Sequence, residues 1–305
     1  MWACFALPPK CSLTGFAKFR LKRASVTHRE FGMAVLRTIA LQARRCLPDT
    51  LADGVIEQAV TTYARVCRRD LPETRFAIIM QPRSGSTLLC DLLDHHPAIR
   101  CQTDELLRKR FRRPIDFLNG MASYYRTRVW GVKIMLEQIL QQESVSDPGR
   151  FLRELKEEGF RLFSLTRRNA FLGTLSHICA HKRGGVYHRN EDVPREVFQR
   201  VTISDPNLFV QMVGRREKAR ETLLNITAGL TDLDFCYEDD LLEAESQAHA
   251  LHTIFNLFGV EPMNVASTFK RISDSSLSNS VTNAEELWEA MEKSPYAGYL
   301  SEVVL

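Results

Sequence analysis

Residues 82–88 bring together side chains that bind phosphate or sulfate. The segment contains, in order, Pro82, Arg83, Ser84, Gly85, Ser86, Thr87 and Leu88. Its glycine lets the backbone approach an anion closely, its hydroxyls can donate hydrogen bonds, and its arginine adds a fixed charge with a forked set of donors. An apolar run precedes it at 75–80, and a helical pattern follows it at 88–95. Because the first amides of a helix lack internal partners, the segment predicts an anion-binding loop, with a well-capped helix start as the alternative.

A second group of candidate residues lies about eighty positions further on. The apolar run 160–166 leads into Arg167 and Arg168, and Ser176 follows eight residues after Arg168 within a helical pattern. Open α/β sheets bind ligands at the carboxyl ends of their strands, so an arginine there can hold an anion while the serine reaches back with its hydroxyl. Taken alone, each of these residues is better explained as a solvated charge or a neutral helix position. Their spacing downstream of the loop favours a second anion site.

The loop differs from the motif that binds nucleoside triphosphates. That motif requires Gly-x4-Gly-Lys-Ser/Thr, in which the lysine reaches the terminal phosphates. Here Gly85 takes the place of the second glycine, Met80 replaces the first, and Ser86 replaces the lysine. A P-loop nucleotide kinase or ATPase is therefore an alternative function with weak support.

The elements around these residues alternate between strand and helix. Short apolar runs at 75–80, 129–135, 160–166 and 233–237 suit buried parallel strands, and helical or loop-like sequence separates them. This alternation predicts an α/β fold with a central, mainly parallel sheet flanked by helices. One domain over 71–305 is the simplest division, preceded by a helical extension at 30–70 and a basic tail at 1–29.

Composition excludes several other classes of protein. The net charge is only +4, from 41 basic and 37 acidic residues, which argues against a nucleic-acid binder. The eight cysteines are scattered without a CxxC pair, as expected of reduced thiols in the cytoplasm. No run of about 18 apolar residues predicts a transmembrane helix. Residues 1–29 contain no acidic residue, so an organellar transit peptide is an alternative to a solvated tail.

The two anion-binding segments resemble those of sulfotransferases that use 3′-phosphoadenosine 5′-phosphosulfate (PAPS). The Arg-Ser-Gly-Ser loop is similar to the 5′-phosphosulfate loop of carbohydrate sulfotransferases, above all the bacterial trehalose-sulfating and nodulation-factor enzymes. The resemblance spans about 75–300 and is carried further by Trp130-Gly131-Val132-Lys133, Tyr237-Glu238-Asp239-Asp240-Leu241 and Asn283-Ala284-Glu285-Glu286-Leu287. Residues 1–70 resemble no family we can name.

This resemblance implies a three-layer, P-loop-like fold and a set of site residues. Donor contacts would come from Arg83, Ser84, Gly85, Ser86, Thr87 and Leu88 at the 5′-phosphate and from Arg168 and Ser176 at the 3′-phosphate. Arg83 would also neutralise the leaving phosphate, and Lys133 would assist, unless it is a strand-end lysine that extends to water. Glu105 is the expected general base, with Asp104 as the alternative.

The remaining expectations concern the acceptor, the histidines and metals. We expect a hydroxyl of a carbohydrate or other small molecule as acceptor, contacted by loops 107–128 and 183–205; a homodimer and a catalytically inactive relative both stay open. His95 and His96 are interpreted as cations at a helix end. His177 and His181 have the four-residue spacing of metal ligands but no third ligand, so no metal is predicted.

Overall fold

The computed structural model describes residues 38–39, 41–43, 49–66, 71–102, 111–125, 127–142, 145–183, 199–267 and 276–305. The chain divides into two compact units, one of Met1–Leu71 with Arg113–Tyr124 and the other of Pro72–Arg112 with Tyr125–Leu305. In the first unit, helix α2 (Asp49–Val66) contacts helix α4 (Pro114–Tyr124), and the amide of Arg113 donates to Glu57 Oε1 at 3.0 Å. A segment far along the sequence therefore completes the N-terminal unit, which a linear division of the sequence does not express.

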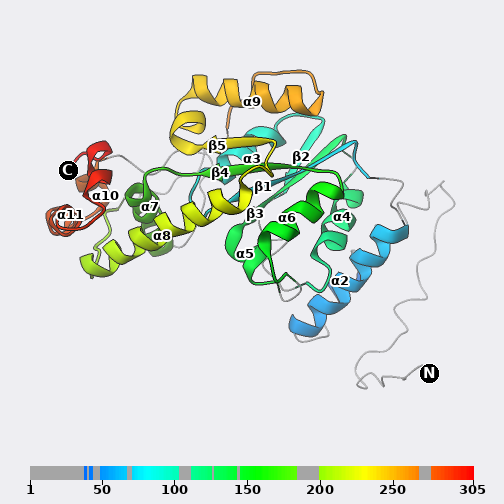
Figure 1. Ribbon diagram of the computed structural model, residues 1–305, viewed down its shortest axis with the longest axis horizontal. Helices are drawn as coiled ribbons and strands as arrows, with labels where there is room; N and C mark the ends of the chain where they lie inside the picture. Colours follow the sequence, from blue (N-terminus) through cyan, green and yellow to red (C-terminus); the bar gives the residue numbers. More distant parts are fainter. Residues whose placement is uncertain are drawn as a thin grey trace. The chain divides into compact units, whose positions relative to one another are not determined.

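The second unit is built on a five-stranded sheet in which all strands are parallel (Figure 1). Its strands are β1 (Thr74–Met80), β2 (Ile99–Gln102), β3 (Val129–Met135), β4 (Phe160–Thr166) and β5 (Leu233–Cys236), in the spatial order β2-β3-β1-β4-β5. The central strand β1 has five consecutive buried residues, because a parallel strand is covered on both faces. The predicted α/β fold with a parallel sheet is confirmed.

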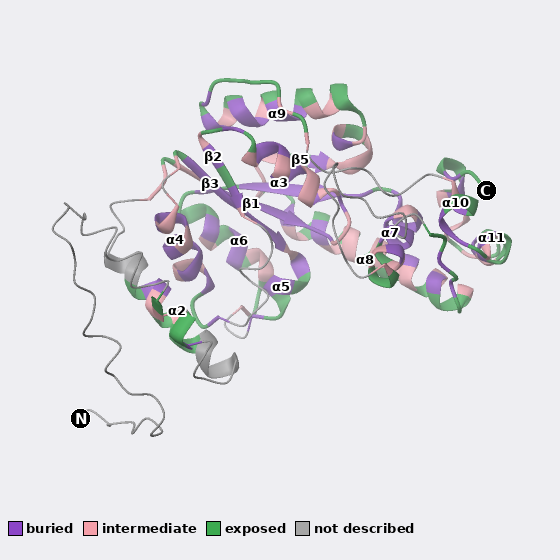
Figure 2. Ribbon diagram, turned by 180° about the vertical axis from the view of Figure 1, so that it is seen from behind, coloured by how far each residue is buried: buried purple, intermediate pink, exposed green. Residues whose placement is uncertain are grey.

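Helices cover both faces of the sheet and give the three layers. Helices α3 (Ser86–Asp94) and α9 (Ala244–Phe258) share one core with alternate side chains of the strands. On the other face, α5 (Leu136–Leu140) contacts β3, whereas α6 (Pro148–Glu157) and α8 (Pro206–Thr227) contact β4. Figure 2 shows that the three middle strands, β3, β1 and β4, are mostly buried between these layers, whereas the edge strands β2 and β5 are partly exposed.

A smaller core lies beside the N-terminal half of α8 (Figure 1). It joins α7 (Ala170–Lys182) and α8 to α10 (Leu277–Ser280), α11 (Ala284–Glu292) and the 3-10 helix η6 (Ala297–Glu302). Phe171 and Phe209 pack edge to face at 5.3 Å between ring centroids, and Leu287 and Met291 are fully buried in the same core. This core fixes the start of α7, the helix that carries Ser176.

None of the described helices is both long enough and apolar enough to cross a membrane.

Candidate functional site

The strand order places three strand ends around the loop that follows β1. β3 and β4 flank β1 on its two sides, in parallel register with it. The chain leaves β1 toward β2, beyond β3, and later crosses to β4 on the other side. A parallel sheet opens a crevice for ligands at the carboxyl ends of the strands where the chain changes direction in this way. Residues at the ends of β1, β3 and β4 are therefore candidates for one common site.

The loop after β1 has an unusual backbone. Arg83 has φ 66° and Gly85 has φ 87°, with Ser84 between them outside the left-handed region. Such alternation turns successive amides toward one side, which is the geometry of an anion-binding nest. Arg83 is the one non-glycine residue of the described chain with positive φ, and strain of this kind concentrates at functional sites. The hydroxyl of the buried Ser84 donates to the carbonyl of Gln81 at 2.8 Å and holds the turn closed.

Gly85 is required at its position for two reasons. Its φ of 87° disfavours a side chain, and an added Cβ would lie 2.5 Å from Cδ2 of Tyr237. Helix α3 starts at the next residue, Ser86, so the glycine is also the N-cap. Tyr237 follows β5 directly, and its ring thus closes one side of the loop.

Two arginines from other elements, Arg167 after β4 and Arg216 of α8, converge on this loop, which itself carries Arg83. Arg167 donates from Nη1 to the carbonyl of Arg83 at 3.3 Å, and Arg216 donates from Nη1 to the carbonyl of Pro82 at 2.6 Å. Burial, together with the charges of Arg167 and Arg83, lowers the pKa of Arg216 to about 10, and Glu137 only partly offsets this. The pKa of His177 is also lowered, by partial burial and by Arg216 and Arg83. An anion bound here would relieve the repulsion among these cations.

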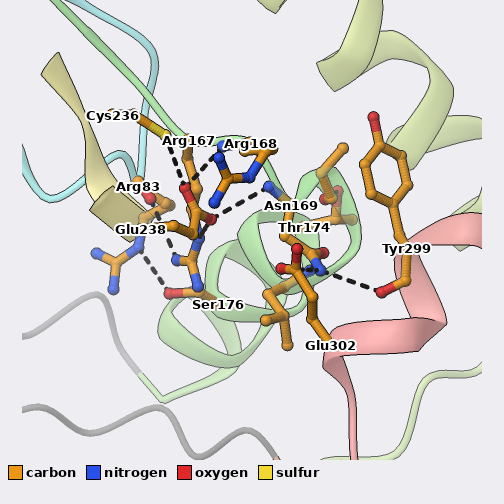
Figure 3. A network of polar contacts seen from close by, with 12 residues as sticks. Arg83, Arg167, Arg168, Asn169, Thr174, Ser176, Cys236, Glu238, Tyr299 and Glu302 are labelled. Carbon is orange, nitrogen blue, oxygen red and sulfur yellow. Dashed lines mark hydrogen bonds and ion pairs between the residues drawn. The ribbon is translucent and has the colours of Figure 1, made fainter. Parts of the chain in front are cut away.

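The second predicted anion segment meets the loop at Ser176. Its hydroxyl accepts a hydrogen bond from Nε of Arg83 at 3.2 Å (Figure 3). Arg168, the predicted partner of Ser176, is instead held by Asp239, to whose carboxylate Nη1 and Nη2 donate at 3.0 and 2.9 Å. The structure therefore brings Arg83 and Ser176 together but directs the Arg168 guanidinium to a carboxylate at the protein surface.

The turn between β4 and α7 is held by side chains from two distant segments. The carboxylate of Glu238 accepts from the amides of Arg168 at 2.8 Å and Asn169 at 3.1 Å. Asn169 caps α7 by accepting from the amide of Leu172, and its own amide group donates to the carbonyl of Tyr299 and to Glu302. Figure 3 shows Asn169 between Glu238 on one side and η6 on the other.

Lys133 contacts the loop helix from the neighbouring strand. It pairs with Ile78 of β1 in the register of the sheet and is only 4% exposed, so it does not extend to water. Its ammonium donates to Thr87 Oγ1, in the first turn of α3, at 2.9 Å. The interpretation of Lys133 as a solvated strand-end residue is wrong, because its side chain points into the layer between β3 and α3.

Four further residues were predicted to belong to the site, and the structure describes two of them. Ser86 is buried at the start of α3, and Leu88 packs against the main core. Glu105 and Asp104, the expected general base and its alternative, lie outside the described residues. The structure describes the surroundings of the other predicted catalytic and binding groups, which are Lys133, Arg168, Ser176 and the loop residues.

The interpretation of His96 as a helix-terminal cation is wrong. Its Nδ1 accepts from the amide of Ala98 at 3.1 Å, so its Nε2 carries the hydrogen that faces the carbonyl of Glu261 at 3.0 Å. A ring that accepts at one nitrogen is neutral. His95 is exposed, and its Nδ1 lies 2.7 Å from the carbonyl of Asp91.

Sequence reasoning missed two residues of this site. Arg216 lies within a helix whose charged residues show no distinguishing pattern, and Glu238 was noted only as part of a motif.

Among the described residues, no group of three or more His, Cys, Asp or Glu side chains could hold a metal ion. No protein-family model matches the chain, and no curated protein matches it.

Proposed function

We propose that the second unit binds PAPS and transfers its sulfuryl group to a hydroxyl of a carbohydrate or other small acceptor. The observation that carries this proposal is the hydrogen bond from Arg83 to Ser176. It joins the loop after β1 to the helix after β4, the two segments expected to hold the 5′- and 3′-phosphates of one nucleotide. A nucleotide that bridges them would exchange this bond for contacts with phosphate oxygens.

The charges around the loop fit a polyanionic donor. Arg83 lies in the loop, Arg167 and Arg216 donate to its carbonyls, and Lys133 approaches the helix that follows it from β3. Guanidinium groups and outward amides are the donors that phosphate oxygens prefer. The Arg168–Asp239 pair is half-exposed, so its exchange for a phosphate contact costs little.

In the proposed reaction, the donor supplies a sulfuryl group whose leaving group is the nucleotide's 5′-phosphate. A bond forms between the acceptor oxygen and sulfur, and the bond from sulfur to the phosphate oxygen breaks. Arg83 and the loop amides would neutralise the charge that develops on the leaving phosphate, which requires donors fixed in advance. We propose that Glu105, or Asp104 as the alternative, removes the proton of the acceptor hydroxyl. A positioned base contributes about 10²–10⁴-fold to a rate.

One contact separates this function from a magnesium-dependent kinase or ATPase. The hydroxyl that follows the motif lysine in nucleoside-triphosphate loops is a magnesium ligand. Here that hydroxyl belongs to Thr87, and the ammonium of Lys133 already donates to it. A divalent cation at the same oxygen would be repelled by this charge. The loop therefore favours binding of an anion without magnesium.

Calorimetric titration with adenosine 3′,5′-bisphosphate in the presence of EDTA tests the proposal. We expect binding by the wild-type protein, and an affinity about tenfold lower for Arg83→Gln, since one charge-assisted hydrogen bond is lost. Arg75→Gln is the matched control because Arg75 lies at the start of β1, at the opposite end of the strand from the loop, where its guanidinium sits 4.8 Å from the centroid of the Phe160 ring. The absence of binding at millimolar nucleotide, or tighter binding of magnesium ATP, would contradict the proposal.

A transfer assay then separates an active enzyme from an inactive relative. Donor with a labelled sulfuryl group is incubated with a panel of glycans and glycolipids, and labelled products are separated. We expect transfer to at least one hydroxyl-bearing acceptor and its loss in Glu105→Ala. Nucleotide binding without transfer to any acceptor would identify a binding protein instead.

A further inference from the structure

We propose that Glu238 is a positioning residue that shapes both anion-binding segments, and that Asp239 beside it competes with the ligand. This inference rests on the proposed function, because it assigns roles within the same site. The two carboxylates are adjacent in the chain and have the same formal charge. Their contacts nevertheless predict opposite effects on ligand affinity.

Glu238 belongs to the site's framework. It lies in a short π-helical turn, η5 (Tyr237–Leu241), that follows β5, and its side chain is only 10% exposed. Helical segments of this type are rare and occur often at functional sites. Besides the amides of Arg168 and Asn169, its carboxylate accepts a hydrogen bond from Sγ of Cys236 at 3.3 Å.

Because of these contacts, the backbone amides of the turn after β4 are bound by a carboxylate of the protein and are not available to a ligand. A strand that passes into a helix presents unpaired amides, and such amides bind anions. At this turn the anion is Glu238 itself. A nucleotide phosphate near α7 must therefore be bound by side chains, such as Ser176 and Arg168, and not by the amides of the turn.

Glu238 also reaches the first loop through Arg167. Its Oε1 lies 3.6 Å from Nε of Arg167, which is 6% exposed. The same guanidinium contacts the carbonyl of Arg83 and lies 4.7 Å from the centroid of the Tyr237 ring. Glu238 thus orients the group that supports the left-handed residue of the loop.

Asp239 has a different set of contacts. Its carboxylate is bound in a bidentate manner by Arg168, and both side chains are about half-exposed. The hydrogen bond from Arg168 lowers the pKa of Asp239, so this carboxylate is ionised at neutral pH. It occupies the donors that the proposed 3′-phosphate would use.

Replacement of either carboxylate by its amide removes one negative charge from the site. By charge alone, both Glu238→Gln and Asp239→Asn should bind an anionic nucleotide more tightly. If Glu238 positions the two segments, its amide variant should bind adenosine 3′,5′-bisphosphate about tenfold more weakly, because a charge-assisted hydrogen bond is lost. Asp239→Asn should bind it more tightly, because Arg168 is released.

The experiment measures nucleotide affinity by calorimetry at low and high salt for the wild type and both variants. Opposite signs for the two variants, with the loss in Glu238→Gln persisting at high salt, support the proposal. Tighter binding by both variants overturns the positioning role of Glu238. Unchanged or weaker binding by Asp239→Asn overturns the competing role of Asp239.

Hydrogen exchange of the ligand-free protein keeps the positioning role testable without the nucleotide. The amides of Arg168 and Asn169 should exchange faster in Glu238→Gln than in the wild type, and unchanged exchange overturns the role. If the wild type does not bind the nucleotide, the proposed function fails and this measurement alone decides the role of Glu238. Should Glu238→Gln fail to fold, Glu238→Asp keeps the charge but shortens the side chain, and the same faster exchange is expected.

Discussion

Gly85→Ala tests both the backbone requirement of the loop and its close contact with the π-helical turn η5. At φ 87° an alanine meets the left-handed penalty of about 1–2 kcal/mol, partly offset by about 0.4–1 kcal/mol from the lower entropy of the unfolded chain. Its Cβ would also lie 2.5 Å from Cδ2 of Tyr237 and 3.3 Å from Cδ1 of Leu241. Overpacking of this kind costs about 1–3 kcal/mol.

Gly229→Ala is the matched control for the backbone. Gly229 has φ 71°, and an added Cβ would have no neighbour within 4 Å. We therefore expect a loss of about 1 kcal/mol in the free energy of unfolding for Gly229→Ala, and about 2–4 kcal/mol for Gly85→Ala. The difference between the two variants measures the steric contact alone.

Urea denaturation of both variants and the wild type measures these losses, provided that the m-values agree. Nucleotide titration should show weaker binding by Gly85→Ala, because Tyr237 must move and the Arg167 guanidinium lies 4.7 Å from its ring. Gly229→Ala should bind as the wild type does. Equal losses of stability in the two variants would refute the reasoning, since they would show that the Tyr237 ring moves without cost.

Three further predictions follow from single contacts. Lys133→Met should bind the nucleotide about tenfold more weakly, because one cation near the loop is lost. Its free energy of unfolding should not fall, because an apolar side chain replaces a buried charge. Titration and urea denaturation check this, and a large loss of stability would contradict it. Asn169→Ala should lower the free energy of unfolding by about 2–3 kcal/mol, since a cap and further buried hydrogen bonds are lost, whereas the exposed cap Asp147→Ala should cost about 1 kcal/mol. Burial, more than any other cause, raises the pKa of Cys236 to about 11, so between about pH 9 and 11 the folded thiol keeps a proton that the unfolded chain releases. The free energy of unfolding should fall with pH over this window, and less steeply in Cys236→Ser; equal slopes would show that this thiol does not titrate differently on folding.

The strands were predictable where burial on both faces makes the sequence continuously apolar. This applies to β3 and β4, whose bounds match the apolar runs, and to β1, which begins one residue earlier. β2 was not among those runs because it is a four-residue strand at the edge of the sheet with polar residues at every second position. The run at 233–237 extends one residue past β5, since Tyr237 begins the π-helical turn.

The loop was predictable because its chemistry is local, but its surroundings were not. Arg216 reaches the carbonyl of Pro82 across 134 positions of sequence, and no neighbouring residue type signals this contact. The direction of the Arg168 side chain likewise depends on Asp239, 71 positions away. Contacts of this kind follow from the strand order, which periodicity and residue type do not specify.

The hydrogen-bond partners of the cations near the loop are themselves an argument for an anion site. In the described part of the chain, Arg220 and Arg168 are paired with carboxylates, as structural ion pairs are. Arg216 and Lys133 instead donate to neutral oxygens, a backbone carbonyl and a hydroxyl, and form no ion pair among the described residues. Neutral acceptors satisfy the hydrogen-bonding capacity of a cation without cancelling its charge. Positive charge is thereby held in place near the loop before any ligand arrives, which is the arrangement that binding of a polyanion requires.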